Sequence, residues 1–147
     1  MVEWDRKAAR QGHVAAQLTL GISYALGKGV PQDHAEAAKW YKIAAEQGSS
    51  DAQYRLGAFY FTGKGVPQDY EEAVKWLMKA AEQGDVTAQH GLGVCYTEGK
   101  GVPIDVREAY KWYQLAADQG HEAAKAPAAS LTRKFHREGK KLAKSVR

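Results

Sequence analysis

The chain of 147 residues contains no asparagine and one cysteine, and no stretch of it is apolar for the roughly 18 residues that a membrane span requires. Without asparagine there is no N-glycosylation site. A single cysteine, Cys95, cannot form an internal disulfide, so nothing in the composition points to an oxidising compartment. These absences leave an ordinary water-soluble composition, with 44% hydrophobic residues.

What the chain does contain is a repeat of 36 residues, the spacing that separates each of its four tryptophans from the next. The loop Gly27–Asp33 returns unchanged as Gly63–Asp69 and with one substitution as Gly99–Asp105. A period of roughly 20 to 50 residues is typical of a solenoid, in which stacked units share one core. We divide the chain into a partial first repeat (1–12), three complete repeats (13–48, 49–84 and 85–120), and a degenerate repeat with a basic C-terminal helix (121–147).

Each complete repeat is predicted to form two helices. In the second repeat, Ala52, Leu56 and Tyr60 share one helical face, and Gly63 can take the positive φ that ends the helix. Asp69 with Glu72 has the spacing of a capping box at the start of the second helix. On that second helix, an apolar face includes the tryptophan, and we expect all four indoles to be buried. The predicted fold class is an all-α superhelix, or solenoid, of 36-residue helix-turn-helix repeats.

The residues that recur in phase are those of a known repeat family. They resemble the Sel-one-like repeat family, a relative of the tetratricopeptide repeats, from Trp4 to about Ala124. The resemblance implies a right-handed superhelix of antiparallel helix pairs that acts as a scaffold for protein partners. Some exported bacterial members carry a disulfide in each unit; this chain departs from that subgroup and gives no support to the hydrolytic activity attributed to it. The matching residues of the second repeat are Ala52-Gln53, Leu56-Gly57, Tyr60, Gly63-Lys64-Gly65-Val66, Asp69, Glu72-Ala73, Lys75-Trp76, Ala80-Ala81 and Gln83-Gly84.

The N-terminus carries no recognisable export signal. The stretch Met1–Asp5 is acidic and lacks the basic and apolar regions of a secretory signal, so the chain as written is expected to be cytoplasmic. Met1 falls at the repeat position of Ala37, in the middle of a unit. The alternative therefore stays open that the chain is a piece of a longer protein, which would be extracytoplasmic if an N-terminal signal was trimmed.

Positive charge is concentrated at the C-terminal end. From Lys125 onward, eight Lys and Arg stand against one acidic residue, Glu138. Pro127 predicts a short turn with a new helix beginning near it, and Leu131, Phe135, Leu142 and Val146 form its apolar stripe. This basic helix is interpreted as the polar cap of the solenoid. The alternative is binding of nucleic acid or of an anionic membrane.

No catalytic constellation, metal site or cofactor motif is found. The Gly27-Lys28-Gly29 loop lacks the glycine spacing and the following Ser or Thr of a phosphate loop, so it is interpreted as a structural turn. No two of the five histidines share a helix at ligand spacing. Cys95 is interpreted as a packed free thiol. The protein is therefore predicted not to be an enzyme.

The surface that varies between repeats is the first helix of each unit, on the side opposite the core. If the stacking of the family holds, these positions line the inner curve and form a groove near 30 Å long, suited to a peptide or a partner helix. The alternative is that Leu18 and Ile22 are covered by the N-terminal helix and the others are scattered surface residues. The predicted partner-binding residues are Leu18, Ile22, Tyr54, Arg55, Ala58, Phe61, His90, Val94 and Thr97, with Tyr54, Phe61 and His90 as central contacts.

Overall fold

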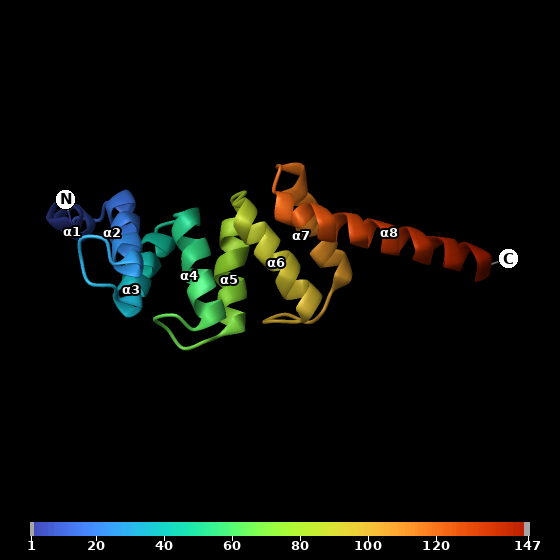
Figure 1. Ribbon diagram of the computed structural model, residues 1–147, viewed down its shortest axis with the longest axis horizontal. Coiled ribbons are helices and arrows are strands. Elements are labelled where there is room, and N and C mark those ends of the chain that lie inside the picture. Colours follow the sequence, from blue (N-terminus) through green and yellow to red (C-terminus); the bar gives the residue numbers. More distant parts are fainter. Residues whose placement is uncertain (1, 146–147) are drawn as a thin grey trace.

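The computed structural model describes residues 2–145, and within them the chain forms eight helices and no strand. The helices follow one another along the long axis of the molecule in chain order, and the last one extends past the others toward the C-terminus (Figure 1). The all-α repeat fold predicted from the sequence is confirmed. The helices are α1 (Val2–Arg10), α2 (Val14–Leu26), α3 (His34–Glu46), α4 (Ser50–Thr62), α5 (Tyr70–Glu82), α6 (Val86–Glu98), α7 (Val106–Asp118) and α8 (Glu122–Ser145).

The first helices of the three complete repeats are α2, α4 and α6, and each ends at the first glycine of the Gly-Lys-Gly loop. That glycine is left-handed, with φ near 72° at Gly27, 77° at Gly63 and 71° at Gly99. Its N–H donates to a carbonyl of the last turn, which satisfies a group that the helix end leaves free. The repeated loop is therefore a helix stop.

The second glycine of the loop brings neighbouring repeats together. A Cβ on Gly65 would run into the backbone carbonyl of His34, at the start of α3, and one on Gly101 would run into that of Tyr70, at the start of α5. These two loops therefore rest on the first turn of the second helix of the preceding repeat. Both loops consequently lie along the same edge of the array.

The second helices α3, α5 and α7 begin at the aspartates predicted as caps. Asp33, Asp69 and Asp105 accept a hydrogen bond from the backbone N–H three residues on. In a full capping box, the glutamate side chain would also accept from the backbone N–H of the cap aspartate. That bond does not form, because each of these N–H groups donates to the carbonyl of Tyr24, Tyr60 or Tyr96. The glutamate side chains pair instead with a lysine one turn later, as Glu72 does with Lys75 at 3.6 Å.

A row of buried glutamines joins consecutive repeats. Gln53 donates through Nε2 to the carbonyl of Ala45 in the preceding helix, and its Oε1 accepts from Gln83 at 2.8 Å. Gln17 and Gln89 repeat the arrangement, so each amide is paired at both ends. Such paired amides fix the register between repeats, because a buried polar group without partners is costly.

The expectation that all four indoles are buried holds for Trp76 and Trp112, whereas Trp40 is half-buried and Trp4 is exposed. Trp76 and Trp112 keep 7% and 6% of their surface exposed, whereas Trp4 is 76% exposed. The cause is the direction of packing: Trp76 joins the cluster built from α3 and α4, so it lies on helices that precede its own. Trp4 lies on α1 and has no earlier helix within the described residues.

Pro127 also departs from the prediction, because α8 continues through it without a turn. The flanking Ala124 and Ala128 are buried against α7 in one cluster, with Leu131 packed on it. This packing keeps the segment helical although proline removes one backbone donor. Of the stripe residues, Val146 lies outside the described part of the chain, and the side chain of Leu142 is not described. None of the helices in residues 2–145 is long and apolar enough to cross a membrane.

Candidate interaction site

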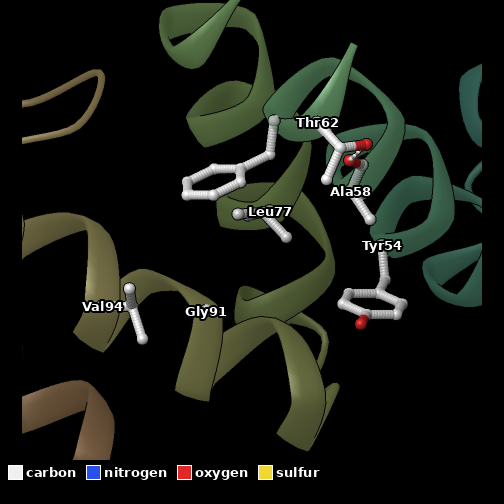
Figure 2. Close-up of a pocket in the computed structure, with 7 residues that line it drawn as sticks. Tyr54, Ala58, Thr62, Leu77, Gly91 and Val94 are labelled. Carbon is white, nitrogen blue, oxygen red and sulfur yellow. Dashed lines mark hydrogen bonds between the residues drawn. The ribbon is translucent and has the colours of Figure 1, made fainter. Parts of the chain in front are cut away.

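An apolar pocket of about 210 Å³ opens between α4 and α6. Figure 2 shows Tyr54, Ala58 and Thr62 on one wall, Gly91 and Val94 facing them, and Leu77 of α5 between the two helices. Phe61 also lines the pocket. No charged side chain is among the lining residues. The pocket can therefore hold an apolar group of the size of one large side chain, since a cavity of about 150 Å³ already accommodates benzene.

The pocket exists because two positions that meet in space carry smaller residues here than in other repeats. In the first and third repeats, tyrosines Tyr41 and Tyr113 occupy the position of Leu77. Arg55 of the second repeat occupies the position that Gly91 holds in the third. Leucine is shorter than tyrosine and glycine has no side chain, so both departures remove atoms from the same place. A Cβ on Gly91 would meet nothing but the methyl groups of Leu77, the nearer at 3.5 Å.

The equivalent gap between α2 and α4 is closed by the residues that the pocket lacks. A Cβ on Gly21 would lie 2.6 Å from the Tyr41 ring, so this ring fills the space beneath α2. Burial raises the pKa of Tyr41, and the charge and hydrogen bond of the adjacent Arg55 offset part of the rise. Arg55 in turn is held by Asp51, whose Oδ1 lies 2.7 Å from its Nε.

The gap between α6 and α8 is closed by aromatic rings. A Cβ on Gly93 would lie 2.5 Å from the Tyr113 ring. The His90 ring lies 5.7 Å from the ring of Tyr113 and 5.1 Å from that of His121, between centroids. Burial, and then the neighbouring His121, lower the pKa of His90. The gap between α4 and α6 thus differs from both neighbours in being open.

The structure brings together four of the nine predicted contact residues, namely Tyr54, Ala58, Phe61 and Val94. The other five have other surroundings. Leu18 and Ile22 pack against the cluster that contains Tyr41, Arg55 pairs with Asp51, and His90 packs on Tyr113 and His121. Thr97 is exposed and donates through its hydroxyl to the carbonyl of Gly93 at 2.7 Å.

Sequence reasoning missed Leu77, Gly91 and Thr62. Leu77 lies on the apolar face of α5 and packs in the core, and its sequence position gives no sign of a contact unless its shortness relative to tyrosine is considered. Gly91 carries no side chain and gave no signal as a contact. A comparison of the repeats position by position for the loss of atoms would have found both.

Cys95 is fully buried and is not part of the pocket. Burial raises the pKa of its thiol to about 11, with a smaller contribution from Glu98, so the thiolate needed for nucleophilic chemistry is scarce at neutral pH. Among the described residues, no group of three or more His, Cys, Asp and Glu side chains is placed to hold a metal ion. What the face around the pocket presents is an apolar surface of defined shape.

The repeat pattern matches the family described as Sel1 repeat at residues 2–13, 14–49, 50–85 and 86–121. The chain belongs to the Sel1 repeat family. Its matched segments include all the helices that form the pocket. No curated protein matches the chain.

Solved structures of this family are similar to the chain. A protective antigen of uropathogenic Escherichia coli strains with an SLR fold is 47% identical over 83% of this chain and 26% of its own length, with a TM-score of 0.82. A Sel1 repeat protein of Oxalobacter formigenes is 37% identical over 91% of this chain and 53% of its own, with a TM-score of 0.85. Cysteine-rich protein B of Helicobacter pylori is 26% identical over 86% of this chain and 96% of its own, with a TM-score of 0.67.

This chain therefore spans about a quarter of the first of these proteins and about half of the second. Sel1 repeat proteins generally act as scaffolds for protein interactions, and the family is of a non-enzymatic scaffold type.

Proposed function

We propose that this Sel1 repeat chain is a non-enzymatic interaction module that binds a peptide or a partner helix along the face formed by α2, α4 and α6. The pocket between α4 and α6 is the anchor point, where one apolar side chain of the partner enters. The observation that supports this most strongly is the paired loss of the closing residues at Leu77 and Gly91.

Two features favour binding over a packing defect. Gly91 lies inside a helix, where glycine costs roughly 0.5–1 kcal/mol relative to alanine, and its Cβ position is free of clashes. Its absence of a side chain is therefore not required by the fold. The walls, moreover, are aromatic and aliphatic, as in the apolar centre of peptide-binding grooves.

The test is to close the pocket with the pair that closes the neighbouring gap. The double variant Leu77→Tyr/Gly91→Arg places the Tyr41 and Arg55 pattern between α4 and α6. Gly57 lies where Gly21 and Gly93 admit a tyrosine ring, so the variant is expected to fold. Peptides are first selected on the intact chain from a displayed random library. Their affinity is then measured by fluorescence anisotropy, and the filled variant is expected to bind at least about tenfold more weakly.

A matched control comes from the outer face of the second helices. Ile43 and Leu115 are exposed, and lysine stands at the same position of the second repeat, as Lys79. The double variant Ile43→Lys/Leu115→Lys therefore changes apolar surface away from the pocket and is expected to keep full affinity. Equal binding by the filled variant, with an unchanged thermal melt, would refute the anchor.

Truncation of the walls is a less clean test than filling. The Phe61 ring packs edge-on against Tyr70 at 5.1 Å and carries the Lys100 ammonium 5.4 Å from its centre. The variant Phe61→Ala therefore loses folding contacts as well as a pocket wall. Tyr54→Ala with Phe61→Ala is expected to abolish binding, but its effect must be read together with its stability.

A second candidate function is binding of nucleic acid or of an anionic membrane by α8. The observation that favours it is a run of exposed basic side chains along the second half of α8, the helix whose end extends beyond the others (Figure 1), comprising Arg133, Lys134, Arg137, Lys140 and Lys141. The apolar residues Leu131 and Phe135 are engaged with α7, since the Phe135 ring lies 5.4 Å from that of Tyr110. This engagement favours a polyanion such as nucleic acid over insertion into a membrane.

This candidate predicts retention on heparin that falls steeply with salt. The five basic residues are replaced by glutamine, which leaves the contacts of Ala128 and Leu131 in place, whereas deletion of the tail would remove them. Loss of retention in the glutamine variant supports the candidate. Retention that is unchanged, or independent of salt, refutes it.

A further inference from the structure

The charges around the pocket indicate which kind of segment it accepts. Two of the acidic residues on α4 and α6 are already paired. Asp51 lies 2.7 Å from Arg55, and Glu98 lies 3.4 Å from Lys100. Lys64, in the loop two residues after Thr62 of the pocket wall, is exposed and forms no ion pair within residues 2–145. The positive charge left over lies at the loop end of the pocket.

Lys100 lies at the same end, where Glu98 offsets its charge. Its ammonium lies 5.4 Å from the centre of the Phe61 ring and 5.4 Å from that of Tyr70. Because each of their two loops rests on the start of the second helix before it, Lys64 and Lys100 occupy neighbouring loops along one edge. An apolar side chain that enters beside Phe61 thus brings the residues next to it toward this loop edge, where Lys64 is the lysine without an ion pair in residues 2–145.

We infer that the partner is a peptide segment that places one aromatic or branched aliphatic side chain in the pocket and an aspartate or glutamate beside it, toward Lys64. This inference rests on the proposed function. An anchor of that size matches the pocket of about 210 Å³, whose lining has no charge to meet a polar group. The carboxylate balances the unpaired charge at the rim, and charge complementarity of this kind sets register and suppresses wrong partners.

The first repeat supplies the matched control. Lys28 occupies the same loop position as Lys64 and is also exposed, but the gap beside it is closed by Tyr41 and Arg55. Both lysines follow the C-terminal end of a first helix, so their effects on the helix are alike. Lys28→Glu and Lys64→Glu therefore differ in one respect, namely whether a pocket lies next to the charge.

The experiment is selection of displayed random dodecapeptides on four forms of the intact chain: unsubstituted, Leu77→Tyr/Gly91→Arg, Lys28→Glu and Lys64→Glu. We expect peptides enriched on the unsubstituted chain to carry a large apolar residue with Asp or Glu within two positions, and to be lost on the filled variant. Lys64→Glu should weaken a selected peptide about two- to fivefold at low salt, while Lys28→Glu leaves it unchanged. Replacing the acid of the peptide by lysine should restore binding to Lys64→Glu.

Four results would overturn the inference. Enrichment of apolar anchors with no acidic neighbour would contradict the role of the carboxylate, and so would equal effects of Lys28→Glu and Lys64→Glu. Neither result would contradict the pocket as an anchor point. Enrichment of peptides with a basic residue beside the apolar anchor would contradict the expected preference for an acidic residue there. Failure to find any peptide that depends on the open pocket would overturn the inference and the proposed function together.

Discussion

Two glycines of this chain are glycine for different reasons. Gly65 has a φ of +69°, and a Cβ there would run into the backbone of His34. Gly91 is helical, and a Cβ there would touch only Leu77 methyl groups, at 3.5 Å and 3.7 Å. The fold requires the first glycine, whereas the second leaves room in the pocket.

Substitution by alanine should separate the two roles. Gly91→Ala is expected to raise the free energy of unfolding by about 0.5–1 kcal/mol, because alanine favours the helix and fits the space. Gly65→Ala is expected to lower it by more than about 1 kcal/mol, through strain and the clash. Urea denaturation measures both. A loss of stability in Gly91→Ala would show that glycine is needed there for packing.

Cys95 offers a second test at this scale. Its thiol is fully buried and its pKa is raised to about 11, so it should not react with Ellman's reagent at pH 8 until the chain unfolds. Because the native state holds the proton more tightly than the unfolded state, stability should fall as pH rises from about 9 to 11. Rapid labelling of the folded chain would contradict the packed-thiol interpretation.

At the scale of helices, most of the structure follows from signals within one repeat. The stop at Gly63 and the start at Asp69 depend on local backbone chemistry, and both were predictable. What failed depended on neighbours: Pro127 stays helical because Ala124 and Ala128 pack on α7, and Trp4 is exposed because nothing precedes it among the described residues. The pocket was half predicted for the same reason, since the space at Leu77 and Gly91 is a property of two repeats together.

The helix α8 should gain stability when Pro127 is replaced. Pro127→Ala restores a backbone donor inside a helix that already forms, so an increase in unfolding free energy on the order of 1–3 kcal/mol is expected. The control is Ser130→Ala, a nearby exposed position without proline, for which a change within about 0.5 kcal/mol is expected. A destabilised Pro127→Ala variant would show that the proline sets a bend that the contacts with α7 need.

At the scale of the whole molecule, the array is held by side chains that reach back to the preceding repeat. Trp112 joins the cluster formed by α5 and α6, as Trp76 joins the cluster of α3 and α4. These two indoles thus each connect one repeat to the one before it. Tryptophans at the same repeat position therefore contribute differently to stability, according to whether a helix of a preceding repeat packs against them.

Replacing these tryptophans should show that difference. Trp112→Ala is expected to cost about 3–5 kcal/mol, as for a large buried aromatic side chain, whereas Trp4→Ala is expected to cost less than about 1 kcal/mol. Thermal unfolding followed by circular dichroism measures both variants. Equal costs would contradict the packing described for Trp4.

The claim on which the functional account depends is that the open gap between α4 and α6 receives the partner. The most direct measurement is the set of amide chemical-shift changes that a selected peptide produces in the ¹⁵N-labelled chain. The largest changes are expected at Tyr54, Ala58, Phe61, Gly91 and Val94, and they should vanish in Leu77→Tyr/Gly91→Arg. Changes centred on α8, or on the exposed face of α3 and α7, would contradict it.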